Sequence, residues 1–320
     1  MPVRYRSPDE DSARWHGFPY RPGDIVISAR SKSGTTWMQT ICALLVFQTP
    51  ELPASLAELS PWLDWLGAPR AEVYARLAAQ RHRRVIKTHT PLHGVPLDRR
   101  ATYVVMARHP LDMAVSLYHQ GDNLDRARIR ALTGQPEPAG PPSRRPPLPT
   151  WLAGWIAWEG DPRAQLDSLP GVMWHLADAW ARRDRPNVVL VHYDDLVADR
   201  EGEMRRLADR LGIDVAEAAW PPLVRAAGFA QMRARADRLA PDQAGVLKDR
   251  AAFFRRGSSG AGREVLTEEG VARYHARAGQ LAPPDLLAWL HRDGHGPALG
   301  AAHGAIPKRH DGRPGPPPGA

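Results

Sequence analysis

Short apolar runs alternate along the chain with stretches in which apolar residues recur at helical spacing. Residues 25–27 form an unbroken apolar run, which is typical of a strand buried on both faces. The period changes at Thr36, and a helical pattern continues to Gln48, with Pro50 as the stop. Further strand-like runs begin at residue 85 and cover residues 101–107 and 187–193, and further helical stretches cover residues 71–80, 110–118, 172–183, 195–212, 268–278 and 283–292.

This alternation predicts an α/β fold, a three-layer α/β/α arrangement around a central parallel sheet with right-handed crossovers. We expect one catalytic domain over residues 24–293, preceded by an irregular N-terminal arm at residues 1–23. Residues 134–149 carry seven prolines, which indicates a mobile loop or lid. The Gly- and Pro-rich tail at residues 294–320 is expected to be disordered.

The segment between the first strand and the first helix has the composition of a phosphate-binding loop. Ser31, Lys32, Ser33, Gly34 and Thr35 lead directly into the helix, whose N-terminus favours negative charge. Gly34 lets the backbone approach a ligand closely, and Lys32 adds a full positive charge. The Walker pattern of ATP-binding loops requires Gly-Lys-Ser/Thr, and no Gly-Lys pair occurs in the chain.

The second strand carries candidate catalytic side chains. Because side chains alternate along a strand, Lys87 and His89 share one face while Thr88 points away. A cation and a titratable imidazole therefore lie side by side near the carboxyl end of a strand, where open α/β sheets bind ligands.

Composition narrows the class of ligand. The net charge of +8 suits an anionic ligand and is also compatible with nucleic acid. Only four of the 43 basic residues are lysines, and Lys32 and Lys87 are two of them. The single cysteine, Cys42, excludes an intramolecular disulfide, and no apolar run reaches about 18 residues, so we expect a cytoplasmic protein without a membrane anchor.

Four motifs resemble those of a known family, the cytosolic-type sulfotransferases. Residues 32–37, Lys-Ser-Gly-Thr-Thr-Trp, resemble the family's 5′-phosphosulfate loop, and residues 87–89 its Lys-Thr-His element. Arg108, Asp112 and Ser116 resemble its 3′-phosphate-binding element, and residues 253–263 its loop that closes over the same phosphate. The motifs follow the family's order between residue 24 and about residue 267, so the resemblance implies the P-loop-NTPase-like sulfotransferase fold.

The resemblance also implies functional roles. His89 is the expected catalytic base, with Lys32, Lys87 and Ser116 in the catalytic set. The co-substrate is expected to be 3′-phosphoadenosine 5′-phosphosulfate, without a metal, and the product adenosine 3′,5′-bisphosphate. The expected nucleotide-binding residues are Lys32, Ser33, Gly34, Thr35, Thr36, Trp37, Arg108, Ser116, Tyr193, Phe229, Arg255, Arg256 and Gly257.

The chain departs from the family pattern at several positions. The hydroxyls that precede the family's nucleotide-binding Phe are absent, and the Asp-Trp-Lys end of the closing loop is replaced by another sequence. The family's dimer signature is also degraded, so we do not predict the usual dimer. The departing residues are Ala227, Gly228, Ala261, Gly262, Arg263, Glu268 and Ala272.

Tryptophans suggest where an acceptor binds. Trp62 and Trp65 lie in a Pro-rich segment and could pack on the domain or line a substrate mouth. Trp151, Trp155 and Trp158 are spaced as a stripe on one helical face, which is more often core than the wall of an apolar acceptor pocket.

The sequence thus predicts a sulfotransferase that acts on a hydroxyl or amine of a small, apolar or aromatic acceptor, with neither nucleic acid nor membrane as partner. Two alternatives stay open. One is a metal-dependent P-loop kinase-like phosphotransferase, and the other is a nucleotide- or nucleic-acid-binding protein without turnover.

Overall fold

Four parallel strands form the central sheet of the computed structural model, which describes residues 2–140, 144–242 and 244–292. The strand order is β2-β1-β3-β4, with β1 at Ile25–Ser28, β2 at Val85–Thr88, β3 at Thr102–Ala107 and β4 at Val188–His192. Ile25 pairs with Val85 on one side and with Thr102 on the other. The predicted parallel α/β sheet is confirmed, and the last two strands match the prediction to within one residue at each end.

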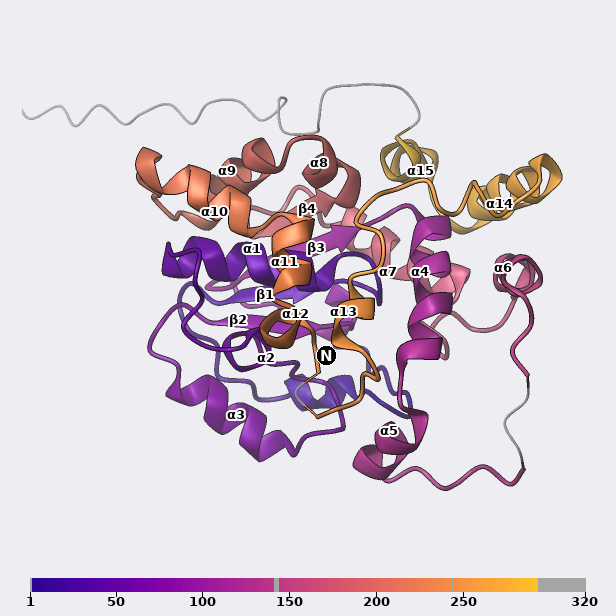
Figure 1. Cartoon of the computed structure of the whole chain (residues 1–320), viewed down its shortest axis with the longest axis horizontal. Helices are drawn as coiled ribbons and strands as arrows, with labels where there is room; N and C mark the ends of the chain where they lie inside the picture. The colour runs from indigo at the N-terminus through magenta and orange to yellow at the C-terminus, as the bar shows by residue number, and fades with distance from the viewer. Residues whose placement is uncertain (1, 141–143, 243, 293–320) are drawn as a thin grey trace, which may run out of the picture.

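Two separate cores cover the two faces of the sheet, because successive strand residues point in opposite directions. Ile25 and Ile27 pack into one core with helices α1, α9 and α10, whereas Val26 and Ile86 pack into the other with α4, α7 and α14. Figure 1 shows the strands at the centre of the molecule, with α9 and α10 on one side and α4 and α6 on the other. This is the three-layer arrangement that the alternating pattern predicts.

The helices surround this sheet in chain order. The α-helices are α1 Thr35–Phe47, α2 Leu56–Leu59, α3 Arg70–Ala79, α4 Pro110–Asn123, α5 Arg126–Thr133, α6 Leu148–Ala157, α7 Leu169–Trp180, α8 Tyr193–Ala198, α9 Arg200–Leu211, α10 Trp220–Ala226, α11 Phe229–Ala234, α12 Ala236–Leu239, α13 Arg250–Phe253, α14 Glu268–Leu281 and α15 Pro284–His291. Short 3-10 helices are η1 Ser12–Trp15, η2 Leu92–Gly94 and η3 Glu217–Ala219.

Local chemistry sets several helix ends. Helix α1 stops at Phe47 because Gln48 adopts a left-handed conformation, with φ of 49°, so it ends one residue before the predicted end. The helix predicted over residues 195–212 is divided into α8 and α9. Asp199 ends α8 and caps α9 by accepting a hydrogen bond from the N–H of Gly202, which explains the break.

The proline-rich segment is shorter than predicted, since α6 begins at Leu148. Proline is tolerated in the first turn of a helix, and Pro149 occupies such a position. Residues 141–143 of this segment and the tail predicted to be disordered at 294–320 lie outside the described residues, as does residue 293 at the predicted end of the domain.

The N-terminal arm packs against the domain. Trp15 is fully buried, and its ring lies 5.4 Å from that of Phe18 and 6.2 Å from that of Tyr20. A backbone bridge joins Glu10 to Trp65. The arm thereby brings its polar residues next to the segment that follows α2.

Candidate active site

A cavity of about 370 Å³ lies where the carboxyl ends of the strands meet. It is lined by residues that follow each of the four strands: Ser31, His89, Arg108 and Tyr193. Parallel sheets bind ligands at this edge. Of the predicted site residues, the cavity is lined by Lys32, Gly34, Thr35, Thr36, Trp37, Lys87, His89, Arg108, Ser116, Tyr193, Phe229, Arg255, Arg256 and Gly257.

Ser33 is the predicted site residue that does not line the cavity. It is buried, and its N–H donates to the carbonyl of Arg30 at 3.2 Å. The hydrogen bond closes the turn of the loop, so the serine has a structural contact of its own.

The loop between β1 and α1 has the backbone geometry of an anion cradle. Lys32 and Gly34 both have positive φ, at 64° and 101°, which folds the loop around the N-terminus of α1. A Cβ on Gly34 would lie 2.8 Å from the side chain of Met106, so glycine is required for space as well as for conformation. The Thr35 hydroxyl is buried without a hydrogen-bond partner in the described structure, which leaves it free for a ligand.

Two lysine ammonium groups enter the cavity over aromatic rings. The Lys32 Nζ lies 3.8 Å from the centre of the Phe253 ring and 3.3 Å from the Gln120 amide oxygen. The Lys87 Nζ lies 3.8 Å from the centre of the Trp62 ring. None of these three contacts supplies a negative charge.

Burial therefore acts strongly on both ammonium groups. It lowers the pKa of Lys32 to about 7, with help from the cations Arg108, Lys87 and Arg255. Burial lowers the pKa of Lys87 to about 8, against the opposing effect of Glu10 and Asp64. An anionic ligand would raise both pKa values, because it stabilises the charged form of each lysine.

His89 lines the cavity with a fixed tautomer. Its Nδ1 contacts the carbonyl of Ala29, an acceptor, so Nδ1 carries the hydrogen and Nε2 the lone pair. Burial, followed by the charges of Lys87 and Arg30, lowers the pKa of His89 well below its ordinary value. The imidazole is thus neutral at pH 7, as a general base must be before it reacts.

Arg108 lines the cavity at the carboxyl end of β3. Its guanidinium lies 4.2 Å over the Tyr193 ring and donates to the carbonyls of Ser258, at 2.9 Å, and Lys32, at 3.3 Å. Its Nε is buried without a partner in the described structure. The residue therefore joins the loop between β1 and α1 to the loop of residues 255–263 and keeps one donor unsatisfied.

Helix α4 holds the loop of residues 255–263 over the cavity. The Asp112 carboxylate accepts hydrogen bonds from the N–H groups of Gly260, at 2.8 Å, and Gly262, at 2.7 Å. A Cβ on Gly262 would lie 2.3 Å from that of Leu111. The departure from the family's Asp-Trp-Lys ending thus has a packing reason, since the loop approaches α4 too closely for a side chain at this position.

The two arginines of this loop, Arg255 and Arg256, differ in their ion pairing. Arg256 forms a two-pronged ion pair with Glu264, at 2.5 and 2.7 Å, and this pair is exposed. Burial, with Arg108 and Arg256 nearby, lowers the pKa of Arg255. An anion in the cavity would therefore stabilise the charge of Arg255 more than that of Arg256, which already has a carboxylate partner.

The tryptophans divide between cavity and core. Trp62 and Trp65 line the cavity, so the substrate-mouth interpretation is the one that the structure favours. Trp155 is buried in the core and donates to the Asp167 carbonyl at 2.8 Å, while Trp158 lies beyond the end of α6 with extended backbone. The proposed stripe of three is therefore wrong for Trp158, and none of the three lines the cavity.

Comparison with known proteins decides the family. The sequence profile described as the sulfotransferase domain matches residues 22–282. The chain belongs to the sulfotransferase family. The match confirms the predicted enzyme class and its co-substrate, 3′-phosphoadenosine 5′-phosphosulfate.

Individual relatives of this sulfotransferase extend the comparison. A glycolipid sulfotransferase of Mycobacterium bovis is 42% identical over 316 residues, covering 92% of this chain and 97% of the relative. Human sulfotransferase 1C2 is 23% identical over 223 residues, covering 68% of each chain.

Solved structures share the fold. Mouse sulfotransferase SULT7A1 complexed with PAP has a TM-score of 0.64 at 17% identity, covering 88% of this chain and 91% of that chain. Retinol dehydratase in complex with androsterone and PAP has a TM-score of 0.63 at 20% identity, covering 86% of each. The predicted fold is confirmed by these neighbours.

Glu10 is a charged residue of the cavity wall that sequence reasoning missed. It comes from the N-terminal arm, and its side chain is 17% exposed. No motif surrounds it, and only the packing of the arm against the domain brings it to the cavity. Among the described residues no helix is long and apolar enough to span a membrane, and no three metal-binding side chains are grouped together.

Proposed function

We propose that this sulfotransferase sulfates a hydroxyl of a glycolipid-like acceptor, with His89 as the base. The observation that carries the proposal is the meeting of Lys32, Lys87, His89 and Arg108 in one cavity. Lys32 follows β1, Lys87 and His89 lie at the end of β2, and Arg108 follows β3, so one cavity brings together cations for an anionic donor and a base for an acceptor. When bound, the co-substrate supplies the activated sulfuryl group.

The residues fit a nucleotide that is phosphorylated at two ends. Near one end, the Thr35 hydroxyl is buried without a partner, beside the N-terminus of α1 and Lys32. Near the other, Arg108 Nε is also without a partner, and Arg255 lies close enough to Arg108 for their charges to repel. Ser116 of α4 lines the same cavity. We assign the first group to the 5′ end and the second to the 3′-phosphate.

We expect the adenine ring of the nucleotide to lie among aromatic residues. Trp37 and Tyr193 lie edge to face, with centroids 5.1 Å apart, and the Trp37 indole N–H donates to the Ala227 carbonyl. A Cβ on Gly257 would lie 2.4 Å from the Phe229 ring, so the loop rests directly on that ring. We assign these residues to the adenosine portion.

The roles of the chain follow from charge and protonation. His89 Nε2 accepts the proton of the acceptor hydroxyl, while the Nδ1–H bond to Ala29 fixes the ring orientation. Lys32 and Lys87 neutralise the negative charge that develops between donor and acceptor. Because both ammonium groups are already in place, little reorganisation accompanies the reaction.

The acceptor class rests on the cavity wall and on the close relative. The name of the M. bovis relative specifies a glycolipid, and 92% of this chain aligns with it. Apolar side chains that suit a lipid chain line the cavity, namely Leu56, Leu117, Leu124, Ile129, Leu239, Val246 and Leu247. An amphiphile with a hydroxylated headgroup matches such a wall better than a wholly polar sugar does.

A labelled-donor assay tests this function. The purified enzyme is mixed with sulfate-labelled donor and with octyl β-D-glucopyranoside, 1-octanol or a simple phenol. We expect label transfer to octyl glucoside without added metal or ATP. Absence of transfer to every acceptor, or consumption of ATP with Mg²⁺, would contradict the proposal and favour one of the alternatives.

We also propose a cytoplasmic enzyme that does not use the family's usual dimer contact. Cys42 is fully buried on α1 as a free thiol, which suits a reducing compartment. Glu268, which disrupts the dimer signature, is exposed at the start of α14. Cell fractionation and light scattering test these two points.

A further inference from the structure

Glu10 reaches the cavity from the N-terminal arm and is fixed there by backbone contacts. Its N–H donates to the Ser7 hydroxyl at 3.0 Å, and the Leu66 N–H donates to the Asp9 carbonyl at 2.8 Å. Its neighbour across the backbone bridge, Trp65, lines the same cavity. The carboxyl group is therefore placed at the wall by rigid structure rather than by a flexible surface segment.

The partly buried carboxyl group of Glu10 has few partners within the described residues. Within the described residues its contact is an ion pair with Arg30 at 4.0 Å, beyond hydrogen-bond distance, and its oxygens receive no hydrogen bond. Burial raises the pKa of Glu10 to about 8, because Asp64 and Asp167 offset the effect of Arg30 and Lys87. The side chain is only partly buried at the cavity wall, so its carboxyl oxygens are available for hydrogen bonds with a ligand.

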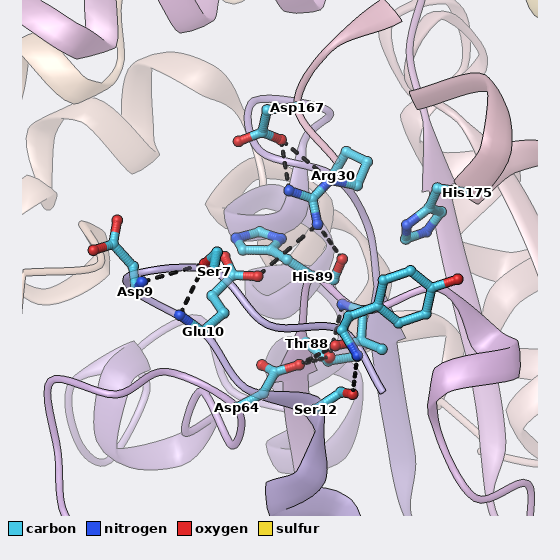
Figure 2. A network of polar contacts seen from close by, with 12 residues as sticks. Ser7, Asp9, Glu10, Ser12, Arg30, Asp64, Thr88, His89, Asp167 and His175 are labelled. Carbon is cyan, nitrogen blue, oxygen red and sulfur yellow. Dashed lines mark hydrogen bonds and ion pairs between the residues drawn. The ribbon is translucent and has the colours of Figure 1, made fainter. Parts of the chain in front are cut away.

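Glu10 also lies close to the reacting end of the cavity. Arg30 Nη1 contacts both the Glu10 carboxylate and the backbone carbonyl of His89. Figure 2 shows the Glu10 carboxyl group and the His89 ring on the same side of Arg30, with Asp167 on the other end of the guanidinium. An acceptor hydroxyl at His89 therefore has its neighbouring atoms within reach of Glu10.

The surrounding charges select the kind of group that binds there. Arg30 and Lys87 disfavour a second cation, and Asp64 and Asp167 disfavour an anion. What remains is a neutral group with hydrogen-bonding capacity, such as a hydroxyl. The stacked rings of Trp62 and Trp65, 5.8 Å apart at 13°, provide an apolar wall beside it.

We propose that Glu10 is a specificity-determining residue that binds the sugar hydroxyls adjacent to the one sulfated. This inference rests on the proposed glycolipid function and names the headgroup contact within that site. The carboxyl group exchanges hydrogen bonds with one or two hydroxyls and orients the ring, so that the reacting hydroxyl faces His89. Glu10 takes no part in the bond changes at sulfur.

The test compares a glycoside with its matching alcohol. The wild type, Glu10→Gln and the exposed control Glu72→Gln on α3 are assayed with octyl glucoside and with 1-octanol. We expect Glu10→Gln to lower kcat/KM for octyl glucoside about 10-fold or more, chiefly through KM, since the loss of one or two well-placed hydrogen bonds to the sugar has an effect of this size. Its kcat/KM for 1-octanol should change less than about 2-fold, as should both values in Glu72→Gln.

Binding measurements separate this role from a structural one. Calorimetry should give unchanged affinity for adenosine 3′,5′-bisphosphate in Glu10→Gln, but weaker octyl glucoside binding to that complex. Glu10→Asp, which keeps the carboxyl group, should recover part of the loss.

Equal losses for both acceptors, or no loss for octyl glucoside beside an active wild type, would overturn the role of Glu10 alone. If the wild type sulfates neither acceptor, the glycolipid function itself is wrong, and the role of Glu10 with it.

Discussion

At the scale of single residues, His89 combines burial, a fixed tautomer and two neighbouring cations. Replacement of His89 by Ala removes the proposed proton acceptor but no group from the proposed nucleotide end of the cavity. We expect kcat to fall by about 10²–10⁴-fold, the usual contribution of a general base. The affinity for adenosine 3′,5′-bisphosphate should change little.

Steady-state kinetics and calorimetry on the same preparation check this expectation. Glu72→Gln, at an exposed position of α3, serves as a control for handling and folding. Near-normal turnover in His89→Ala would remove the histidine from the mechanism.

Lys32 makes nucleotide binding depend on pH. Its pKa is about 7 in the free enzyme, because it is buried among cations. A bound phosphate raises this pKa, so binding above pH 7 takes up a proton and becomes weaker as pH increases. We expect the affinity for adenosine 3′,5′-bisphosphate to fall from pH 6.5 to about 8.5 in the wild type, with a flatter profile in Lys32→Arg.

Calorimetry in buffers of different ionisation enthalpy measures the proton uptake directly. A wild-type affinity that is constant or rises over this interval would contradict the assigned position of Lys32.

At the scale of elements, the closeness of α4 to the loop of residues 255–263 is the most sensitive contact. Gly262→Ala places a methyl group 2.3 Å from the Leu111 Cβ, so the loop must move away from α4. Overpacking of this kind costs about 1–3 kcal/mol. We expect weaker binding of adenosine 3′,5′-bisphosphate, because Arg255 and Gly257 move with the loop.

Gly279→Ala is the matched control. Gly279 is exposed in α14, with nothing within 4 Å of an added Cβ, so this variant should be as stable as the wild type or slightly more stable. Urea unfolding and nucleotide titration of both variants check the difference. Unchanged nucleotide affinity in Gly262→Ala would show that the loop does not need its contact with α4.

Much of the site could be predicted at this scale. Strand ends and short motifs place Lys32, His89, Arg108 and Arg255 because each lies within a few residues of a recognisable element. Gly262 could not be understood in the same way. Its departure from the family pattern depends on its distance to Leu111, which is 151 positions away in the sequence and is set by tertiary packing.

At the scale of the whole molecule, a buried ion pair joins the amino ends of the strands. The Arg84 guanidinium donates to both Asp24 oxygens, at 2.5 and 2.8 Å, and both side chains are at most 2% exposed. Loss of Arg84 leaves the Asp24 charge buried and unpaired. Arg84→Met should therefore lower the free energy of unfolding by about 3–5 kcal/mol.

The double variant Asp24→Asn/Arg84→Met removes the unpaired charge and should recover part of this loss. Nucleotide affinity should persist in both variants, because the pair lies at the end of the sheet opposite the cavity. Urea unfolding and calorimetry give the two quantities. A loss below about 1 kcal/mol in Arg84→Met would indicate that the pair does not stabilise the fold.

Long-range assembly also limits what the sequence could predict. The N-terminal arm has no periodic pattern, yet it supplies Trp15 to the core and Glu10 to the cavity. Its position depends on contacts with residues about 50 positions further along the chain, such as the bridge from Glu10 to Trp65. The residues proposed to bind the nucleotide lie in short sequence motifs. The residues proposed to bind the acceptor come from segments that only the folded chain brings together.

The assignment of Arg108 to the 3′-phosphate provides the most direct test of the nucleotide site. Calorimetry compares adenosine 3′,5′-bisphosphate with adenosine 5′-monophosphate, which lacks the 3′-phosphate, on the wild type and on Arg108→Ala. We expect the wild type to prefer the bisphosphate by about 10-fold or more, as charged hydrogen bonds to one phosphate allow. Arg108→Ala should lose most of this preference while its affinity for the monophosphate changes little. Equal weakening of both nucleotides, or no binding of the bisphosphate by the wild type at millimolar concentration, would contradict the account.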